Sequence, residues 1–387
     1  MKFQALGSNY SGAWTLKQLF AIGNRDDHRQ LTTMLEQRFD GKAYLYARGR
    51  YALAEAIRLA CDNTDKPRVA VNALTCSVVI DAIHAAGALP LYIDVDSDTA
   101  HFSADSLESA LDDQSSVCAV IVQNTYGRMI DIAPIETLAQ THHLTLIEDI
   151  AHSIGQSYPD GREAGMVGDL VMLSFGRDKL LDVTNGGALI IRNTSFMARV
   201  VAPTNWPNAT TQLRDRIYPL LTWLVRHTYA IGLGKLIHFT MYLLKIAIRS
   251  AEGEIDTSQR LPNWQAKLAL KRFAVLDQLN TRRRERMELY QAYLGESLIS
   301  RDGTIRAALA VDNRTESLQR LRDAGYELVD TWYDTPIGPA SKYKALAYPV
   351  DDCPRAVELS KRIINLPTHD QVNYHDIERI AQIVRQR

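Results

Sequence analysis

The stretch Gly168–Arg192, GDLVMLSFGRDKLLDVTNGGALIIR, holds two strongly apolar runs separated by a short polar loop. The runs LVMLSF and ALIIR are short and rich in branched apolar residues, so each predicts a buried strand. Ser174 lies near the end of the first strand, and the loop carries a single lysine, Lys179. A lysine in a loop is usually a solvated surface charge. Only the rest of the chain can show whether this one has a chemical role.

The same alternation of strands and helices extends over residues 68–193. Short β-rich runs predict strands at 68–74, 89–96, 117–127, 144–149, 170–175 and 188–192, and helical patterns lie between several of them, at 77–87, 103–113 and 132–143. Near-continuous apolar strands alternating with helices predict an α/β fold with a mostly parallel sheet covered on both faces. Ligands bind such sheets outside the carboxyl ends of the strands.

The flanking regions predict a second, smaller unit. Helical spacing of apolar residues predicts helices near 27–39 and over 49–60, and one long amphipathic helix over 264–295. The remainder mixes short strands and helices. The length of 387 residues fits a large domain over 1–255 and a linking segment, long helix and small C-terminal α/β domain over 256–387.

Composition narrows the classes of function. A net charge of −1 gives no electrostatic case for nucleic-acid binding. Four scattered cysteines without a CxxC pair argue against a zinc site or a disulfide framework and suit a reducing cytosol. The first residues lack the pattern of a signal peptide, and no apolar run reaches the length of a membrane span. We therefore expect a cytoplasmic protein.

Polar residues at predicted strand ends and helix starts suggest a cofactor site. Asp149 ends a buried strand, Lys179 follows the next predicted strand, and Gly49-Arg50 opens a helix whose N-terminus can receive a phosphate. Taken singly, the acid could cap a turn, and the glycine could simply separate two secondary-structure elements. Together they provide a lysine for a Schiff base, an acid for a pyridinium nitrogen and a phosphate cradle, which pyridoxal phosphate (PLP) requires. Ser174 adds a hydroxyl for the phosphate.

These motifs resemble the DegT/DnrJ/EryC1/StrS sugar aminotransferase family, within the fold-type I PLP enzymes. The matching stretches follow the family order over most of the chain outside 202–254: GRYAL (49–53), TCSVVIDAIHAAGALPLYIDVD (75–96), IVQNTYGRMIDI (121–132), IEDIAHSIG (147–155), GDLVMLSFGRDKLLDVTNGGAL (168–189), RLPNWQAKLALKRFAVLD (260–277) and INLPTHDQVNYHDIERIAQIV (364–384). Each motif is weak alone, whereas their order and spacing together are specific.

The resemblance implies a role for each matching residue. Lys179 corresponds to the lysine that bonds to the cofactor and moves protons, and burial and nearby positive charge would lower its pKa. Asp149 corresponds to the acid at the pyridine nitrogen, and His152 to the contact of the ring's phenolic oxygen. Phosphate contacts are implied for Gly49, Arg50 and Ser174. A dehydratase branch of the family carries histidine at the lysine position, so Lys179 favours transamination.

Some positions depart from the family pattern. Cys76 stands where many relatives place an aromatic residue that stacks on the cofactor ring, which leaves the stacking residue open. Arg50 replaces a small hydroxyl residue, either as a bidentate phosphate ligand or as a surface arginine. Relatives reach the neighbouring subunit's site with Asn-x-Arg, where this chain has Ser258-Gln259-Arg260. Tyr126 of the Tyr-Gly pair is expected, like Ser258 and Arg260, to contact substrate or the partner subunit.

Residues 202–254 are longer and more apolar than the usual family connection. Apolar and aromatic residues in 213–250 are interrupted by basic ones, with Asp215 the lone acid, and predict one or two helices broken near Gly232–Gly234. Three interpretations remain open: extra buried helices or an enlarged dimer interface, a helical pair on a membrane surface, and a lid over a hydrophobic substrate.

The expected activity is amino transfer by PLP. The resemblance implies glutamate as the donor, pyridoxamine phosphate (PMP) as the amino carrier, a keto group of a nucleotide-linked sugar as the acceptor, and a homodimer without metal. One alternative acceptor is a lipid-linked or long-chain carbonyl compound at the inner face of the membrane. A non-catalytic PLP-fold regulator or partner-binding protein is the alternative of another class, and the joint retention of Lys179, Asp149 and Ser174 argues against it.

Overall fold

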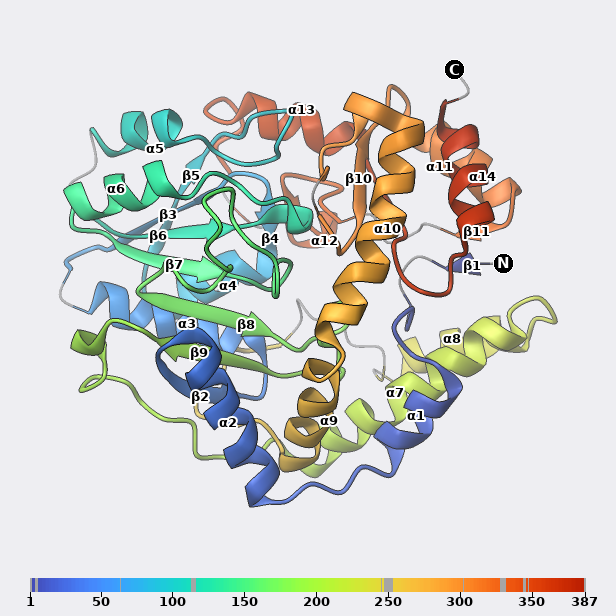
Figure 1. Cartoon of the computed structure of the whole chain (residues 1–387), viewed down its shortest axis with the longest axis horizontal. Helices are drawn as coiled ribbons and strands as arrows, with labels where there is room; N and C mark the ends of the chain where they lie inside the picture. The colour runs from blue at the N-terminus through green and yellow to red at the C-terminus, as the bar shows by residue number, and fades with distance from the viewer. Residues whose placement is uncertain are drawn as a thin grey trace.

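A seven-stranded sheet forms the centre of the molecule (Figure 1). The computed structural model describes residues 2–3, 6–62, 64–112, 116–244, 246, 253–301, 303–327, 332–343, 346 and 348–385. The strand order is β2-β9-β8-β7-β6-β3-β5. The strands are β2 (Lys42–Tyr46), β3 (Arg68–Asn72), β5 (Leu89–Ile93), β6 (Val117–Gln123), β7 (Thr145–Asp149), β8 (Leu170–Ser174) and β9 (Gly187–Ile191). Pairs from β5 through β8 are parallel, and β9 runs antiparallel to β8 and β2. The predicted α/β fold is confirmed.

Both faces of the sheet are covered because the strands are apolar on both faces. In β6, Val120 and Val122 belong to one core, and Ala119 and Ile121 belong to the other. This is the alternation that a pleated strand imposes. The first core contains residues of α2 (Arg25–Phe39), α5 (Ala104–Leu111) and α6 (Ala133–Thr141). The second contains residues of α3 (Gly49–Cys61) and α4 (Ser77–Ala85).

The long helix expected over 264–295 is wrong as a single element. Two helices occupy this region, α9 (Asn263–Phe273) and α10 (Leu276–Leu294), and Val275 between them has a non-helical backbone (φ −120°, ψ 11°). The break lets the two halves pack in different places. Phe273 of α9 belongs to a core of the large sheet, whereas Tyr290 of α10 belongs to a third core.

That third core lies in the C-terminal part of the chain. It joins α10 to the antiparallel pair β10 (Ala307–Ala310) and β13 (Ile363–Leu366) and to α14 (Tyr374–Arg385). The other elements here are α11 (Arg314–Asp323), β11 (Tyr326–Glu327), β12 (Ile337–Gly338), α12 (Ala340–Tyr343) and α13 (Pro354–Arg362). The N-terminal strand β1 (Lys2–Phe3) pairs with β11, and β4 (Thr75–Cys76) pairs with β12. Strand pairing therefore ties this part to the start of the chain and to the segment that precedes α4.

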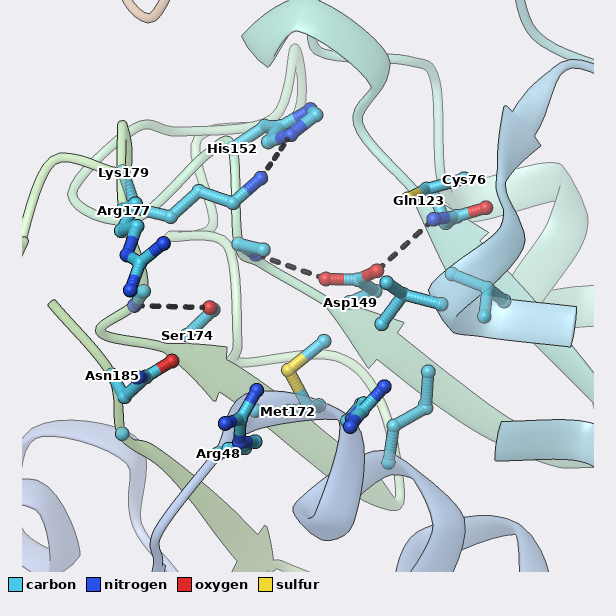
Figure 2. Close-up of a pocket in the computed structure, with 18 of the residues that line it drawn as sticks. Arg48, Cys76, Gln123, Asp149, His152, Met172, Ser174, Arg177, Lys179 and Asn185 are labelled. Carbon is cyan, nitrogen blue, oxygen red and sulfur yellow. Dashed lines mark hydrogen bonds between the residues drawn. The ribbon is translucent and has the colours of Figure 1, made fainter. Parts of the chain in front are cut away.

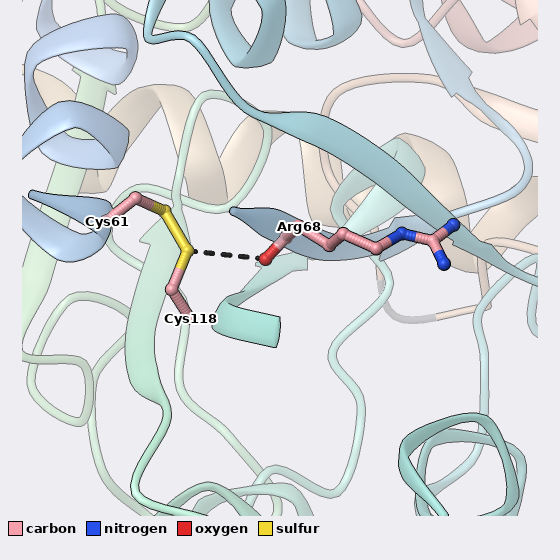
Figure 3. Close-up of a disulfide and its surroundings, with 3 residues drawn as sticks. All are labelled: Cys61, Arg68 and Cys118. Atoms are coloured by element: carbon pink, nitrogen blue, oxygen red, sulfur yellow. Dashed lines mark hydrogen bonds between the residues drawn. A yellow bond between two sulfur atoms is a disulfide. The ribbon is translucent and has the colours of Figure 1, made fainter. Parts of the chain in front are cut away.

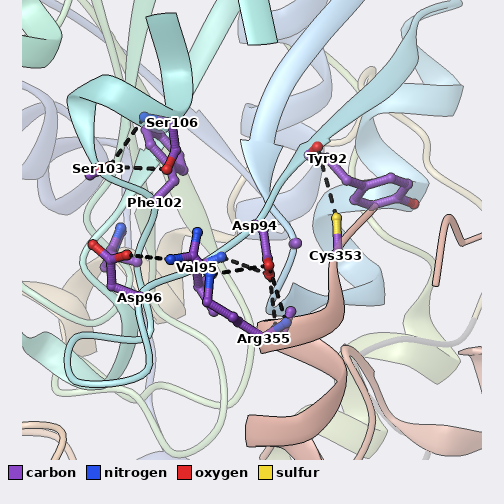
Figure 4. A network of polar contacts seen from close by, with 12 residues as sticks. Tyr92, Asp94, Val95, Asp96, Phe102, Ser103, Ser106, Cys353 and Arg355 are labelled. Carbon is purple, nitrogen blue, oxygen red and sulfur yellow. Dashed lines mark hydrogen bonds and ion pairs between the residues drawn. The ribbon is translucent and has the colours of Figure 1, made fainter. Parts of the chain in front are cut away.

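An ion-pair network also fastens α13 to the end of β5 (Figure 4). The Asp94 carboxylate accepts the backbone N–H groups of Arg355 and Ala356, at 3.1 and 2.9 Å, in the first turn of α13. The Arg355 side chain contacts Asp94 at 3.3 Å and Asp96 at 3.1 Å. A carboxylate at a helix N-terminus is favoured by the helix dipole, so this contact fixes how α13 meets the sheet.

Two of the cysteines form a disulfide, contrary to the expectation from the sequence (Figure 3). Cys61 ends α3 and Cys118 lies in β6, with Cα atoms 5.4 Å apart. The pair is 57 residues apart in sequence and meets only because α3 packs on the sheet, so no local motif announces it. Cys76 and Cys353 are free cysteines. Among the described residues, no group of three His, Cys, Asp or Glu side chains is placed to hold a metal.

The described residues of 202–254 contain a pair of helices, with the break where the sequence predicts it. Helix α7 (Ala209–Thr228) packs beside α1 (Gly12–Leu19), and Tyr218 and Val225 join Tyr10 in a small core. Gly232 adopts a left-handed conformation and α8 (Leu233–Leu243) follows it (Figure 1). Several large apolar side chains of α8 are exposed: Leu233, Leu236, Phe239, Tyr242 and Leu243. No helix in the described part of the chain is long and apolar enough to cross a membrane.

Candidate active site

A cavity lies at the carboxyl ends of β7 and β8, beside the start of α3 (Figure 2). All residues predicted to hold the cofactor line it: Gly49, Arg50, Cys76, Asp149, His152, Ser174 and Lys179. The parallel order of the strands explains this convergence, since parallel strands deliver their carboxyl ends to one edge of the sheet. The roles of these residues remain predictions, which the following geometry supports.

Asp149 is held by two neutral donors. Its Oδ1 accepts the backbone N–H of Ala151 at 3.0 Å, and its Oδ2 accepts Nε2–H of Gln123 at 3.0 Å. Gln123 is itself fixed by the Thr75 hydroxyl, which donates to its Oε1 at 2.6 Å. Burial raises the pKa of Asp149 above its usual value. A buried carboxylate whose hydrogen bonds, among the described residues, come from neutral donors fits a site for a positively charged ring nitrogen.

Lys179 and His152 form a pair whose protonation follows from the hydrogen bonds. The backbone N–H of Tyr126 donates to Nδ1 of His152 at 3.3 Å, so Nδ1 is unprotonated and a neutral ring carries its proton on Nε2. Burial, together with Lys179 and Arg306, holds the pKa of His152 well below its usual value, so the ring is neutral. Nε2 lies 2.7 Å from Nζ of Lys179 (Figure 2). The imidazole therefore donates, and the lysine accepts as a neutral amine.

The environment of Lys179 independently favours the neutral amine. Burial lowers its pKa, with Arg306 acting in the same direction and Asp149 against it. Its Nζ lies 4.6 Å from the ring centroid of Trp332, which stacks on His152 at 4.7 Å. Trp332 comes from the segment before β12, and no pattern in the sequence marked it as part of the site.

The predicted phosphate site is built by close packing at glycines. A Cβ on Gly49 would lie 3.0 Å from Oγ of Ser174, and one on Gly187 would lie 2.4 Å from Cα of Gly49. Glycine at 187 therefore lets the start of α3 approach β9 this closely, and glycine at 49 avoids a tight contact with Ser174 of β8. Helix α3 begins without a side-chain cap, so its N-terminus is suited to an anion. The phosphate group of PLP would be such an anion.

Arg50 and Cys76 have definite places in the wall. Arg50 is 4% exposed, which excludes the surface interpretation, and its Nη2 donates to the carbonyl of Glu254 at 3.3 Å. Cys76 is the N-cap of α4, and burial raises the pKa of its thiol. Tyr333 also lines the cavity, so an aromatic ring reaches it from the C-terminal part of the chain instead of from position 76.

Tyr126 lies behind the wall of the cavity. Its side chain is fully buried, its hydroxyl donates to the carbonyl of Trp332 at 3.1 Å, and it is not among the residues that line the cavity. Its expected contact with substrate or a partner subunit stays a prediction. Its backbone N–H sets the tautomer of His152, a role that the Tyr-Gly motif could not indicate.

Ser258 and Arg260 lie outside the cavity of their own chain. The Ser258 hydroxyl donates to Asp256 at 2.6 Å, and the Arg260 guanidinium lies 4.2 Å from the ring centroid of Trp206. Neither residue contacts the cavity of its own chain, so the contact with a neighbouring subunit stays a prediction.

Side chains connect α7 to the lysine loop, a connection that no motif in the sequence indicates. Asn185, in the cavity wall, donates to Asp215 of α7 at 2.6 Å, and the Arg177 guanidinium lies 3.6 Å from the ring centroid of Tyr218. Burial alone would lower the pKa of Arg177, but Tyr218 and Asp215 raise it overall. The signal in the sequence was Asp215 itself, a lone acid in a basic and apolar segment.

The family model that matches the chain is described as the DegT/DnrJ/EryC1/StrS aminotransferase family and covers residues 46–385. Among curated proteins, the chain is 25% identical over 326 residues to GDP-perosamine synthase of Caulobacter vibrioides, covering 82% of this chain and 78% of that protein. It is 23% identical over 339 residues to a pleiotropic regulatory protein of Geobacillus stearothermophilus, with the same coverage of 82% and 78%.

Solved structures share the fold. DesV of S. venezuelae in complex with a ketimine intermediate superposes with a TM-score of 0.72 at 21% identity, covering 97% of this chain and 94% of that one. The sugar aminotransferase Spr1654 of Streptococcus pneumoniae in its PMP form gives a TM-score of 0.70 at 17% identity, covering 97% and 96%.

Proposed function

The chain belongs to the DegT/DnrJ/EryC1/StrS aminotransferase family and is a PLP-dependent aminotransferase, and from this premise we propose that it transfers an amino group from glutamate to a keto group of a nucleotide-linked sugar. The observation that carries the chemistry is the 2.7 Å contact between Nζ of Lys179 and Nε2 of His152, in a cavity that Asp149 also lines. The name of the GDP-perosamine synthase relatives supports a nucleotide-linked sugar as the acceptor.

The residues of this chain would bind PLP at both of its ends. The N-terminus of α3 and Ser174 would bind the phosphate, and Asp149 would face the ring nitrogen and keep a proton there. When bound, PLP supplies a carbonyl carbon that reacts with amines and a ring that takes up electron density. A protonated ring nitrogen increases that capacity, which is why a buried, ionised Asp149 matters.

Lys179 would then be the proton carrier. A neutral amine would accept the proton from the amino-bearing carbon of the donor and deliver it, in the same half-reaction, to the former carbonyl carbon of the cofactor; the half-reaction with the acceptor would move a proton in the opposite direction. His152 keeps the amine neutral by donating from Nε2, and its own charge is suppressed by burial. Burial of the pair also keeps water from competing for the same proton.

Spectroscopy of the purified protein tests the proposal directly. The protein should show the visible absorption of lysine-bound PLP, which glutamate should convert to the absorption of PMP. A nucleotide-linked keto sugar, chosen from a panel that varies the base and the position of the keto group, should restore the first spectrum. A protein that binds no PLP would contradict the enzyme, and one whose spectrum no amino donor changes would favour a regulator, as the name of one relative suggests.

We also propose a homodimer in which Ser258 and Arg260 reach the partner's site. Their position outside their own cavity supports this arrangement. Mixing inactive Lys179→Ala protein with Arg260→Ala protein under conditions that exchange subunits should produce activity, because one site of each mixed dimer combines both intact contributions. A mixture as inactive as the separate variants would contradict shared sites.

A second candidate acceptor is a lipid-linked or long-chain carbonyl compound at a membrane surface. The exposed apolar side chains of α8 favour it: Phe239, Tyr242 and Leu243 are 63%, 72% and 67% exposed. Between residues 209 and 244 the lone acid, Asp215, is buried, so the exposed charge of this segment is cationic. The basic residues Lys245 and Arg249 lie outside the described residues. Apolar and cationic groups together suit an anionic lipid surface.

Vesicle binding separates the two acceptors. Co-sedimentation with phosphatidylglycerol vesicles, and not with phosphatidylcholine vesicles, should be lost in Phe239→Ser/Leu243→Ser if α8 binds lipid. Recovery of all the wild-type protein in the supernatant with both lipids would count against the membrane candidate and leave the nucleotide-linked sugar.

A further inference from the structure

A second cavity lies on the other side of the Lys179 loop. It has a volume of about 500 Å³, within the range of small-molecule sites. Its walls come from the segment before α1, from α7, from α9 and α10, and from the loop between β13 and α14. It shares no lining residue with the cofactor cavity, but Leu180, which follows Lys179, lines it. We call it the cationic cavity because of the arginines described next.

Among the described residues, three arginines of the cationic cavity donate hydrogen bonds to neutral oxygens only, and the guanidinium of Arg272 also lies 3.8 Å from the ring centroid of Trp14. Arg226 donates from Nη2 to the carbonyl of Tyr10 at 2.7 Å and from Nη1 to the side chain of Gln371. Arg272 donates to the carbonyls of Asp182 and Asn9, at 3.3 and 2.9 Å.

Arg283 has the same kind of surroundings and is 6% exposed. It donates to the carbonyl of Ile305 at 2.9 Å, to the hydroxyl of Thr368 at 3.2 Å and to Oδ1 of Asn9 at 2.8 Å. Carbonyls, amides and a hydroxyl orient the three guanidinium groups without neutralising their charge.

The acid in the wall of the cavity is engaged by other arginines. Asp370 pairs with Arg282 at 3.0 Å and with Arg286 at 3.2 Å. Asp182, behind the wall, accepts four hydrogen bonds from the side chains of Asn9 and Tyr10 and the backbone N–H groups of Asp178 and Thr184. Burial lowers the pKa of Arg226 and of Arg283 to about 10, and neighbouring arginines contribute at Arg283. Bringing an anion here would relieve this concentration of positive charge.

Asn9 connects the cationic cavity to the catalytic loop. Its side-chain oxygen and its carbonyl accept Arg283 and Arg272, and its Nδ2 donates to the carbonyl of Lys179 at 3.0 Å. An anion that engages these arginines therefore acts on a group already bonded to Lys179. An anion bound in the cationic cavity could therefore be part of a substrate or a separate ligand that affects the Lys179 loop.

We propose that the cationic cavity binds a diphosphate group. Three guanidinium groups that line one cavity match the charge and the many acceptor oxygens of a diphosphate better than those of a single carboxylate. The diphosphate group would belong either to the nucleotide-linked acceptor or to a separate diphosphate compound. The first of these sources rests on the proposed function. Two indole side chains in the wall, Trp14 and Trp223, provide a fluorescence signal for binding.

Titration of the holoenzyme with inorganic pyrophosphate tests the site. Pyrophosphate should change tryptophan fluorescence and raise the melting temperature of the wild type. Arg226→Gln should weaken binding about tenfold or more, because it removes one charged donor. Arg284→Gln is the matched control, since Arg284 is an exposed arginine on α10 outside the cavity, and it should bind as the wild type does. Equal affinity in all three proteins, or no binding by the wild type at millimolar pyrophosphate, overturns the proposal.

Kinetics identify the source of the diphosphate. If it belongs to the acceptor, pyrophosphate competes with the acceptor, and Arg226→Gln raises KM for the acceptor but not for glutamate. If it is separate, pyrophosphate binds without competing. The conversion of lysine-bound PLP by glutamate is recorded on the same samples. Its loss would refute the proposed function, whereas normal conversion without pyrophosphate binding would refute the cationic cavity alone.

Discussion

The two cavities beside the Lys179 loop treat charge in opposite ways. In the cofactor cavity, burial lowers the pKa of both Lys179 and His152 and raises that of Asp149, so each of these groups is shifted towards its neutral form. In the cationic cavity, three guanidinium groups are held by neutral oxygens and keep their charge. The difference follows from chemistry: an amine loses its proton when buried, whereas a guanidinium does so only at extreme cost. The Lys179 loop thus contributes residues to both cavities: Lys179 lines the cofactor cavity, and Leu180 lines the cationic cavity.

Replacing Lys179 should have the largest effect. Lys179→Ala removes both the covalent attachment and the proton carrier, so we expect amino transfer to fall by about 10⁴-fold or more. The visible absorption of lysine-bound PLP should disappear, while pyrophosphate binding to the cationic cavity persists. Lys235→Ala, on the exposed face of α8, is the control and should leave both readouts unchanged. Loss of pyrophosphate binding in Lys179→Ala would show that the cavities are not independent.

Asp149→Asn should come next. The amide keeps the shape and an acceptor for the Ala151 N–H, but it loses the charge that would hold a proton on the ring nitrogen. We expect kcat to fall about 10²–10³-fold, as when a single electrostatic contact to the reacting group is removed. PLP should remain attached to Lys179. Asp169→Asn, at the opposite end of β8, provides a control in which activity should be retained. An unchanged kcat in Asp149→Asn would remove this carboxylate from the mechanism.

His152→Ala should have a smaller effect that depends on pH. In the wild type, the Nε2–H group of His152 stabilises the neutral amine of Lys179. Without this donor, the pKa of Lys179 should rise towards its usual value. Attachment of PLP to the apo-protein requires the neutral amine, so its rate should fall about tenfold at neutral pH, the cost of one such hydrogen bond, and recover at higher pH. His152→Gln can donate from its amide and should restore the wild-type profile. Identical pH profiles for wild type and His152→Ala would contradict the assigned tautomer.

The contrast between the cavities also explains what the sequence could predict. The carboxyl ends of β7 and β8 are local features of the strand pattern, so Asp149 and Lys179 could be identified and placed together. Trp332 and the Cys61–Cys118 pair arrive by packing between distant segments, and no periodicity encodes that packing. The arginines of the cationic cavity come from three helices and read individually as ordinary surface charges. The cofactor cavity could be predicted because its residues lie in local motifs. The cationic cavity could not, because its arginines come together only in the folded chain.

The helices α7 and α8 also differ from each other, in how their side chains are buried. Asp215 of α7 is buried and accepts Asn185 from the cofactor cavity, whereas Phe239 of α8 is 63% exposed. Asp215→Asn should lower the free energy of unfolding by about 1–3 kcal/mol, because a hydrogen bond to a buried charged group is weakened. Phe239→Ser should change it by less than about 0.5 kcal/mol, as for most surface substitutions. Urea unfolding of both variants measures the difference. Equal stabilities would mean that α7 does not support the catalytic loop, and a large loss in Phe239→Ser would mean that α8 is covered in solution by a second subunit.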